Sequence, residues 1–440
     1  MPKKLTSLMT MLAAFGFAIS AQNPAWLEPD SASAMKYRIN RDFPFTVAEI
    51  KEKLPEISPE KIDEYIAKGY IETLNVDGVT KVHRKAARNV KLLAPDFVGE
   101  WGGRGVDYND DERRMIARNI SQSVGDGTPV DTQRITFRFT IDVPTRDFLR
   151  GDTLSVWMPV PIESVRQSRV RILKAEPADY VVSTLTRSDH NTICFRAPVT
   201  ADTTHFEYVC EYDVAAQYYS PEYIRENLRP YDKQSELYKK YTAMEAPHII
   251  PIKDEEFLAK VSGGATAPYE ISENVLTYIS QNIPWAGARE YSTIACMPEY
   301  VMSCGHGDCG QVTMLYLSIM RSLGVPARWE SGWMMNPGQE NFHDWGEVYF
   351  EGVGWVPVDP SFGRYPEDFG PDNMRNYYST GLDRMRLAAN RGICGDFFPP
   401  KRFIRSETVD NQAGEVECSK GNLFYPGWNQ NLEIISIEQK

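Results

Sequence analysis

The sequence predicts an α+β protein with three units: a small N-terminal α+β module, an antiparallel β-sandwich and a C-terminal α+β core. Six short β-like runs separated by turn residues, between residues 128 and 218, predict the sandwich. Apolar residues at helical spacing after residue 255, followed by two strand-like runs, predict the core. We expect units at residues 22–125, 126–218 and 219–440, the last with a C-terminal extension, which agrees with a length of 440 residues.

The first 21 residues have the three parts of a secretory signal peptide. Two lysines precede a mainly apolar run from Leu5 to about Ala18, and the small residues Ser20 and Ala21 follow. This run is too short for a membrane span, and no later stretch approaches the roughly 18 apolar residues that a span requires. We therefore expect an exported protein, periplasmic or extracellular, without stable membrane insertion.

The charge of the chain argues against nucleic acid as a partner. Loss of the leader removes two lysines and changes the net charge from −12 to −14. A surface this acidic does not favour binding to a polyanion.

The segment 22–125 carries local signals of helix and hairpin. In SPEKIDEYIAKG, Ser58 is the expected N-cap, Pro59 the first helical residue and Gly69 the C-terminal cap. Asp77 and Gly78 then predict a tight hairpin turn. We interpret this segment as a structural module, with a pro-region that covers an active site as the alternative.

The β-rich segment and the residues after it follow in order. The runs RITFRFTIDV, TLSVWMPVP, RVRILKAE, YVVSTLTR, NTICFRAP and HFEYVCEYDV are the expected strands of the sandwich, for which we expect a scaffold role. A helical linker is expected near residues 220–241. The helix that begins the core is YEISENVLTYISQNI, whose apolar residues share one face.

Seven cysteines in an exported chain leave one unpaired if the other six form disulfides. The pairs that local spacing suggests are Cys194 with Cys210 across a hairpin, Cys296 with Cys304, and Cys394 with Cys418. These pairings leave Cys309 as the free thiol.

Cys309 lies where a nucleophile is favoured. The run QVTMLYLSIMRSLGVPAR after it predicts a buried helix that ends near Gly324 and Pro326. Cys309 would occupy the first turn, where unpaired N–H groups and a partial positive charge favour thiolate. Asp308 is the expected N-cap, and its charge would partly oppose this effect, so a cationic partner is needed.

The expected partners of Cys309 lie in NFHDWGEVYFEGVGWVPVDPSFG, which predicts two strands and a tight turn. If the loop has three residues, 351–353, two residues face each other across the strands when their numbers add up to 704. His343 then faces Ser361, and Asp359 lies on the same face of the hairpin. A two-residue loop would put the two on opposite faces. Asp344 should point to the other side of its strand, and we interpret it as a solvated acid.

Together, GDCGQVTMLYLSIMRSLGVPAR and HDWGEVYFEGVGWVPVDPSFG resemble the core of the transglutaminase-like superfamily, which uses a papain-like Cys-His-Asp arrangement on an α+β fold. The resemblance covers about 60 residues. It implies that Cys309, His343 and Asp359 correspond to the catalytic triad. The tail RFIRSETVDNQAGEVEC and GNLFYPGW also resembles accessory regions of exported bacterial members.

Other residues near these motifs are candidates for supporting roles. The backbone N–H of Cys309 is a natural donor to an oxyanion, and the second donor is open among Trp285, Tyr291 and Gln311. The candidates for a substrate groove are His306, Trp333 and Trp345. A metal knuckle formed by Cys304, His306 and Cys309 is an alternative that lacks an obvious fourth ligand.

These residues predict an exported thiol hydrolase that cleaves an amide through a thioester, with a peptide or protein as substrate. Its chemistry needs no cofactor and no metal. The alternatives are a crosslinking transglutaminase, in which an amine replaces water, and a non-catalytic peptide- or glycan-binding module on the same fold. The sequence leaves the oligomeric state open.

Overall fold

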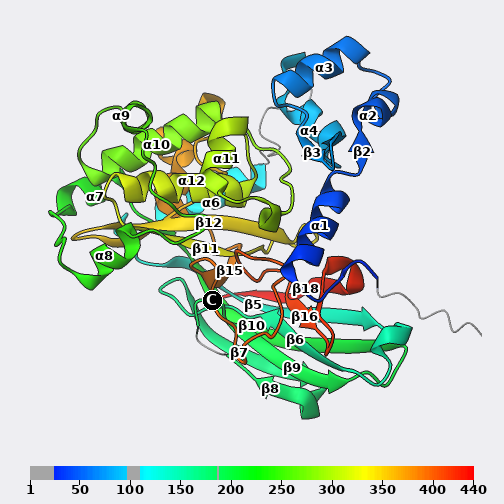
Figure 1. The fold of residues 1–440 in the computed structure, drawn as a ribbon. Coiled ribbons are helices and arrows are strands. Elements are labelled where there is room, and N and C mark those ends of the chain that lie inside the picture. The colour runs from blue at the N-terminus through cyan, green and yellow to red at the C-terminus, as the bar shows by residue number, and fades with distance from the viewer. Residues whose placement is uncertain (1–23, 97–109, 186–187) are drawn as a thin grey trace, which may run out of the picture.

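The computed structural model describes residues 24–96, 110–185 and 188–440, and the expected leader at 1–21 lies outside them (Figure 1). The described chain has the predicted mixed α+β fold, with its strands in antiparallel sheets. Among the described residues, no helix is long and apolar enough to cross a membrane.

The N-terminal module is a small sheet surrounded by short helices. Ser58 caps its second helix and accepts a hydrogen bond from the N–H of Lys61, as the sequence predicts. Asp77 and Gly78 form the predicted turn, with φ angles of 51° and 82°. The elements are β2 (Phe45–Thr46), α2 (Val47–Lys53), α3 (Pro59–Ala67), β3 (Thr73–Val76), β4 (Val79–Val82) and α4 (Ala86–Leu93).

The rest of the expected N-terminal unit packs elsewhere. β1 (Leu27–Glu28) joins a sheet of the sandwich, and α1 (Ser31–Asp42) leads from there to the module (Figure 1). Helix α6 (Asp110–Gln122) packs on strands of the sandwich and, through a hydrogen bond from Asn119 to Tyr377, on a later segment. The expected unit 22–125 is therefore spread over three parts of the molecule.

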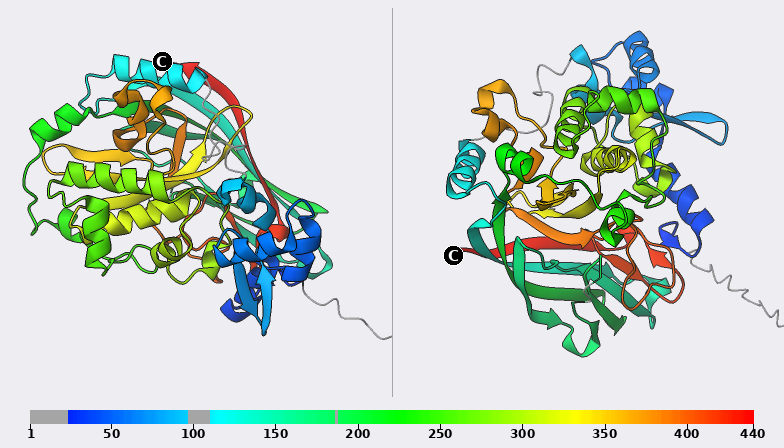
Figure 2. Two further views of the ribbon diagram at one scale, coloured as in Figure 1. Left: turned by 90° about the horizontal axis from the view of Figure 1, so that it is seen from above. Right: turned by 90° about the vertical axis from the view of Figure 1, so that its left-hand side faces the viewer.

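Two sheets pack face to face and form the sandwich (Figures 1 and 2). One has the strands β1, β17 (Asn422–Leu423), β16 (Glu415–Glu417), β6 (Thr153–Pro159), β9 (Thr192–Pro198) and β8 (Val181–Ser183). The other has β14 (Gly381–Leu382), β10 (Thr203–Tyr218), β5 (Val130–Pro144), β18 (Asn429–Gln439) and β7 (Gln167–Glu176). Alternating apolar side chains such as Phe137 and Phe139 fill the space between the sheets.

The sandwich takes its last strands from the end of the chain. β16 pairs with β6, and β18 runs along β5 over most of its length. The expected unit 219–440 therefore does not remain in one place, because residues 415–439 return to complete both sheets of the preceding unit. The C-terminal residues are drawn in red beside the green strands of the sandwich (Figure 2).

The core is a four-stranded sheet with helices on one face (Figure 1). The strand order is β13 (Gly354–Val358), β12 (Asn341–Phe350), β11 (Ala327–Met334), β15 (Arg386–Arg391). The helices before it are α7 (Pro221–Asn227), α8 (Glu236–Thr242), α9 (Glu255–Ser262), α10 (Pro268–Asn282), α11 (Met297–Cys304) and α12 (Cys309–Ser322). Two single turns, α13 (Asp372–Arg375) and α14 (Tyr377–Thr380), lie between β13 and β15 in the chain.

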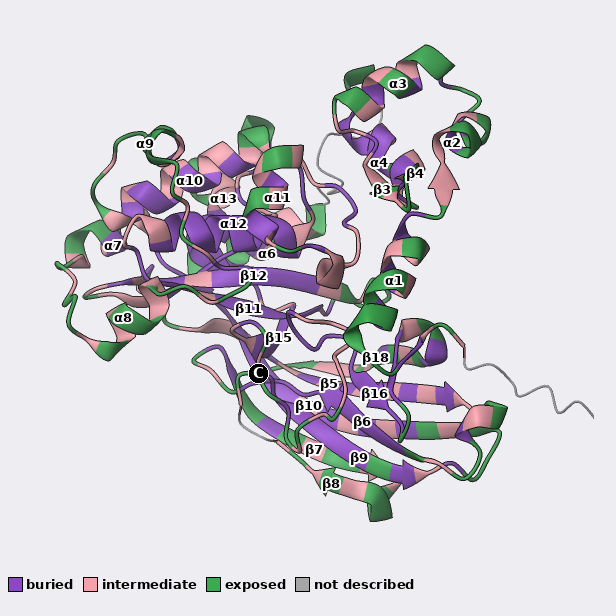
Figure 3. Cartoon of the chain, in the orientation of Figure 1, coloured by how far each residue is buried: buried purple, intermediate pink, exposed green. Residues whose placement is uncertain are grey.

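Helix α12 is the centre of this unit. It is buried from Gly310 to Arg321 and packs on the face of the sheet that carries Val348 and Phe350 (Figure 3). The opposite face, with Trp345, packs on aromatic residues around Tyr377, and Trp333 enters the core of the sandwich. The first turn of α12 therefore lies where helix, sheet and sandwich meet.

Candidate active site

Cys309 begins α12, and its neighbours fix the start of the helix. The Asp308 carboxylate accepts a hydrogen bond from the N–H of Gln311 at 3.1 Å, and the Gln311 side chain accepts one from the N–H of Asp308, also at 3.1 Å. This capping box confirms Asp308 as the N-cap. It also engages the side-chain oxygen of Gln311, one of the three candidates for the second oxyanion donor. Nε2 of Gln311, the atom that could donate to an oxyanion, is buried without a hydrogen-bond partner among the described residues, so Gln311 stays a prediction for this role.

His343 and Asp359 meet across the predicted hairpin. Gly346 pairs with Val358 and Phe350 with Gly354, so the loop has three residues and paired positions sum to 704, as predicted. Nε2 of His343 lies 2.7 Å from Oδ2 of Asp359, and both side chains are buried. The remaining ring nitrogen, Nδ1, is then the one available to a nucleophile.

The surroundings of Asp359 keep its carboxylate charged. Oδ1 accepts hydrogen bonds from the N–H groups of Ser361 and Phe362, and the Arg386 guanidinium lies 3.5 Å from Oδ2. Burial alone would raise the pKa of Asp359, but His343 and Arg386 outweigh it, and the pKa lies below its ordinary value. A charged Asp359 orients the imidazole and can stabilise its protonated form.

Asp344 is not the solvated acid that the sequence suggested. Its side chain is buried, with Oδ2 accepting a hydrogen bond from Sγ of Cys309 at 3.2 Å and Oδ1 accepting one from Nε2 of Gln412 at 2.8 Å. It does point away from His343, as alternation requires, but that side of β12 faces α12. His343 stacks with Trp345 on the opposite face of β12, and no hydrogen bond joins Cys309 to His343 among the described residues.

This contact changes the electrostatics of the nucleophile. Burial and the carboxylates of Asp344 and Asp308 raise the pKa of the Cys309 thiol well above its ordinary value. The helix N-terminus was expected to lower the pKa of this thiol. In this arrangement that effect is outweighed, because two acids face the sulfur. The hydrogen bond to Asp344 and the raised pKa both favour the thiol form of Cys309 in this arrangement.

Asp344 is part of a larger group of buried acids. Burial and a second acid, Asp410, raise the pKa of Asp344, and burial raises the pKa of Asp410 to about 6. Beyond Asp410, burial and neighbouring carboxylates raise the pKa of Glu407, and burial raises that of Glu290 to about 7. Their raised pKa values mean that these acids stay protonated at pH values where isolated carboxyls are ionised.

Acidification from pH 8 to pH 5 is expected to stabilise the wild type relative to the Asp410→Asn variant, by about 2 °C or more in melting temperature. The folded-state pKa of Asp410, about 6, exceeds that of an unfolded chain, so this group binds a proton on folding in the lower part of this range. Its contribution to stability is thus complete below the unfolded pKa and is lost as pH rises through the folded pKa. The comparison with the variant is needed because burial lowers the pKa values of His83, His190 and His248 to about 3 to 4, and these groups destabilise the fold on acidification in both proteins. Calorimetry of both proteins at pH 5, 6, 7 and 8 tests this, and a difference in melting temperature that does not change with pH would contradict it.

The two other candidates for the second oxyanion donor lie on the loop before α11. Trp285 forms an isolated bridge with Gly307, two residues before Cys309, and the Arg88 guanidinium lies 4.9 Å from the centre of its ring. Tyr291 donates its hydroxyl hydrogen bond to Asp308 and is thereby engaged with the N-cap. Trp285 stays a prediction for this role.

The N-terminal module contacts the same loop. The Asn89 side chain forms two hydrogen bonds with the backbone of Gly287, at 2.9 and 3.0 Å, and Lys85 donates to the carbonyl of Ala288 at 2.6 Å. His306 is buried beneath the module, with Nε2 3.3 Å from the carbonyl of Gly69. His306 therefore does not lie at an open mouth of the site.

Two expected groove residues belong to the core instead. Trp333 packs against Phe342 with ring centres 4.5 Å apart and donates its indole N–H to the carbonyl of Gln412. Trp345 is fully buried and donates to Glu330 at 3.0 Å. Both are 5% exposed or less, because each strand face of the central sheet is covered by another layer.

The expected disulfides are absent, since all seven cysteines are free thiols. Cys194 and Cys210 lie on β9 and β10, which belong to different sheets rather than to one hairpin. Cys296 is the N-cap of α11 and Cys304 is its last residue, so the helix separates them by about 12 Å at 1.5 Å per residue. In the third expected pair, Cys394 is exposed, whereas Cys418 is buried in the sandwich.

The alternative of a metal site at Cys304, His306 and Cys309 is not supported. Cys304 donates to the backbone carbonyl of His306, and the ring of His306 contacts Gly69. Among the described residues, no group of three His, Cys, Asp or Glu side chains is placed to hold a metal ion.

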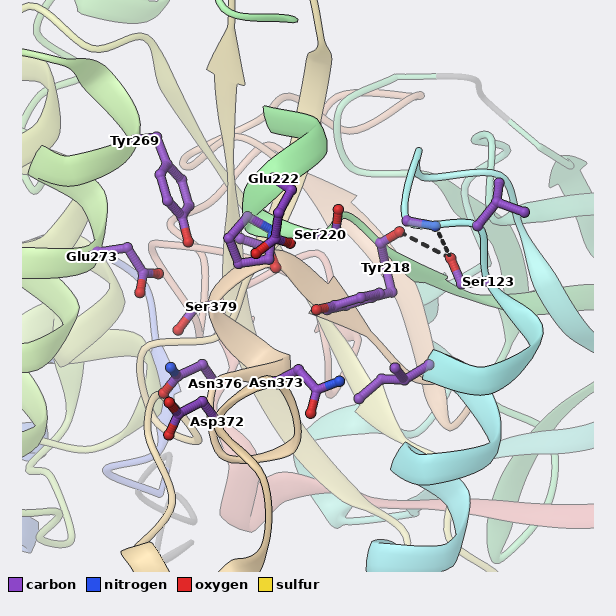
Figure 4. Close-up of a pocket in the computed structure, with 15 residues that line it drawn as sticks. Ser123, Tyr218, Ser220, Glu222, Tyr269, Glu273, Asp372, Asn373, Asn376 and Ser379 are labelled. Carbon is purple, nitrogen blue, oxygen red and sulfur yellow. Dashed lines mark hydrogen bonds between the residues drawn. The ribbon is translucent and has the colours of Figure 1, made fainter. Parts of the chain in front are cut away.

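A cavity of about 210 Å³ lies beside the candidate site. Its walls include Trp285, Gly307, Val312 and Ser361, which come from the loop before α11, the turn before Cys309, α12 and the segment after Asp359. A second cavity, of about 410 Å³, lies between α6, α10 and α13 (Figure 4). None of the candidate site residues lines this second cavity.

Comparison with known proteins agrees with the expected family. The sequence model of the Transglutaminase-like superfamily matches residues 255–360. The Bacillus subtilis protein YebA, described as uncharacterised, is 26% identical over 107 residues, which make up 21% of this chain and 14% of YebA. The chain thus matches only a small part of this relative.

Two solved structures are also similar. A candidate cysteine protease from Cytophaga hutchinsonii is 12% identical with a TM-score of 0.44, and the match covers 70% of this chain and 99% of that one. The periplasmic domain of TgpA from Pseudomonas aeruginosa is 13% identical with a TM-score of 0.25, and the match covers 62% and 96%.

Proposed function

The chain carries a core of the Transglutaminase-like superfamily at residues 255–360, and on this basis we propose that it is an exported cysteine-dependent amide hydrolase. Cys309 is the nucleophile, His343 the general base and acid, and Asp359 the residue that orients the imidazole. The substrate is a peptide or protein. Export rests on the leader sequence at residues 1–21.

The observation that supports this function most strongly is the buried contact of 2.7 Å between His343 and Asp359. The residue after His343 on the same strand, Asp344, contacts the Cys309 thiol from the opposite face of β12. A non-catalytic binding module has no need of a buried His-Asp pair beside a cysteine.

The reaction would proceed in two acyl transfers. The reaction requires Sγ of Cys309 to leave Asp344 and reach Nδ1 of His343, which then takes the thiol proton. Sγ attacks the amide carbon to form a tetrahedral intermediate. The imidazolium then gives its proton to the leaving nitrogen, the C–N bond breaks and a thioester remains. Water, deprotonated by His343, attacks the thioester and releases the acid and the free thiol.

The cavity of about 210 Å³ is well situated for the acyl part of the substrate. It borders both the start of α12 and the segment that follows Asp359. Its lining residues are Ile279, Ser280, Gln281, Ile283, Pro284, Trp285, Gly307, Val312, Pro360 and Ser361. None of them is charged, which favours an uncharged group of the substrate.

Hydrolysis rather than amine transfer is expected to dominate. No described feature identifies a pocket for an amine acceptor, and water is abundant at an exported site. Incubation with a glutamine-containing protein and a labelled primary amine should release ammonia with little incorporation of label, at most about a tenth of the turnover. Predominant incorporation would instead assign the crosslinking activity, and the Cys309→Ala variant is the control for both products.

A further inference from the structure

The larger of the two cavities, about 410 Å³ between α6, α10 and α13, is not used by the reaction above (Figure 4). We propose that it binds a neutral saccharide, held by Oε1 of Glu273, Oγ of Ser379 and the side-chain amide of Asn376. The volume lies within the range of roughly 300–1,000 Å³ that small-molecule sites occupy. Because the candidate triad does not line this cavity, the inference does not depend on the proposed hydrolase.

The first support is a pair of buried oxygens in one wall of the cavity. Oε2 of Glu273, on α10, accepts a hydrogen bond from Arg364 at 2.7 Å, whereas Oε1 is buried and has no hydrogen-bond partner among the described residues. Oγ of Ser379, on α14, is in the same situation, and Ser379 is only 2% exposed. Buried polar groups without a partner are uncommon in folded proteins. Two of them in one cavity wall indicate that a ligand supplies the missing hydrogen bonds.

These two side chains have further polar neighbours. Figure 4 shows Glu273 and Ser379 gathered with Tyr269 and Asn376 on one side of the cavity. The two tyrosines of the lining, Tyr218 and Tyr269, are themselves buried. A ligand in the cavity therefore meets hydroxyl, amide and carboxylate groups within one wall.

The second support is that hydrogen bonds already hold the walls in place. Oγ1 of Thr380 donates to the carbonyl of Tyr219 at 2.7 Å, and the N–H of Tyr219 donates to the carbonyl of Thr380 at 3.0 Å, so that α14 is fixed to the end of β10. The N–H of Ser220 donates to the carbonyl of Gly125 at 2.8 Å, which fixes the turn after α6. Side chains that are ordered before binding reduce the entropy that a ligand must offset.

The charges of the wall exclude an anion as the ligand. Among the described residues that line the cavity, three are acids, Glu222, Glu273 and Asp372, and none is a lysine, arginine or histidine. A phosphate or carboxylate would be repelled by these groups. Two of the acids already pair with a cation, Glu273 with Arg364 and Asp372 with Arg375, which leaves little net charge to attract a cationic ligand.

The mixture of donors and acceptors favours hydroxyl groups on the ligand. Oε1 of Glu273 only accepts, whereas the hydroxyl of Ser379 and the amides of Asn373 and Asn376 both donate and accept. A sugar hydroxyl also does both and can therefore satisfy every one of these groups. An ammonium group only donates, and it would leave the amide N–H groups without an acceptor.

The cavity also has apolar surface. Ile120, on α6, and Pro221, at the start of α7, belong to its lining. Such side chains can cover the C–H groups of a sugar ring, while the polar wall contacts its hydroxyls. A polar wall beside apolar side chains is the composition expected of a site for a small polar ligand.

Saturation-transfer NMR on the full chain tests the proposal with a panel of neutral hexoses, pentoses, N-acetylhexosamines and their disaccharides. At least one neutral sugar should bind, and its uronate and amino-sugar counterparts should bind about tenfold more weakly or less, which separates a neutral site from a charged one. Preference for the uronate or the amino sugar, or no binding by any member of the panel, would overturn the proposal. Cys309→Ala should bind the sugar as the wild type does, so failure of the hydrolase and failure of this site are distinguishable.

Two variants place the sugar in this cavity. Ser379→Ala should weaken binding about fivefold or more without lowering the melting temperature, because Oγ has no partner in the free protein to lose. In Glu273→Gln the side-chain oxygen keeps its contact with Arg364, and an uncharged N–H group replaces Oε1. The loss of a charged acceptor should again weaken binding about fivefold or more.

Matched controls are Ser121→Ala, an exposed serine of α6 outside the lining, and Glu226→Gln, an exposed acid of α7 outside it. Both should bind the sugar within about twofold of the wild type, since neither side chain lines the cavity. Unchanged affinity in both Ser379→Ala and Glu273→Gln would show that the sugar binds elsewhere and would overturn the assignment of this cavity.

Discussion

Replacement of Cys309 with alanine is expected to lower kcat/KM for amide hydrolysis by about 10⁴-fold or more, because the covalent route is lost with the sulfur. His343→Ala should have an effect of similar size, and the double variant should be no worse than either single one. A mixture of fluorogenic peptides first identifies those that the wild type cleaves. Initial rates on these peptides then measure kcat/KM for each variant.

The matched control for Cys309 is Cys296→Ala. Cys296 is a free thiol just before helix α11 and forms no side-chain cap there, so it has the same residue type near a helix start without the His-Asp pair. It should keep wild-type activity within about twofold. Full activity in Cys309→Ala would exclude the proposed nucleophile.

Asp359→Asn is expected to lower kcat by about 10³- to 10⁴-fold while the fold is kept. The N–H groups of Ser361 and Phe362 donate to Oδ1, so an asparagine oxygen would take that position and its NH₂ group would face Nε2 of His343. Nε2 must then accept, the ring proton moves to Nδ1, and the imidazole can no longer take a proton from the thiol.

This tautomer change can be measured directly. Nitrogen NMR of the labelled imidazole should show the proton on Nε2 in the wild type and on Nδ1 in Asp359→Asn. Glu367→Gln, an exposed change of the same kind eight residues later, should alter neither the tautomer nor kcat. An Asp359→Asn variant with normal activity would show that Asp359 does not orient the ring.

The parts of the site that depend on local rules were predictable from the sequence. The N-cap at Asp308 and the helix after it follow from the apolar run and the capping residues. The alignment of His343 with Asp359 follows from the parity of a three-residue turn. The six strands of the sandwich also lie where the alternating runs predicted them.

The interpretation of Asp344 as a solvated acid fails because it considers a single residue apart from its strand. Asp344 alternates with Gly346, Val348 and Phe350, and the face that these residues form is apolar, which predicts burial for any side chain on it. The signal is therefore present in the period of the strand. An acid on an apolar face is costly unless it is paired, and its partners come from segments that the local pattern does not identify.

Other differences depend on contacts between segments far apart in the chain. Nothing local to residues 429–439 indicates that they pair with the much earlier strand β5, and their alternation fits any exposed strand. Trp333 and Trp345 are buried rather than in a groove, and tryptophans near a site suit both roles. The position of Gln412 against Asp344 requires the complete fold of the C-terminal segment.

The central claim is that His343 activates Cys309, and the rate of alkylation of Cys309 against pH, compared between wild type and His343→Ala, tests it most directly. An unperturbed thiol ionises near pH 8.5. The contact with Asp344 favours the thiol, so labelling below that pH requires transfer of the proton to His343. We predict that labelling of the wild type persists well below that pH and is lost in His343→Ala. Equal labelling of the two proteins, rising only near pH 8.5 or above, would contradict a Cys-His pair.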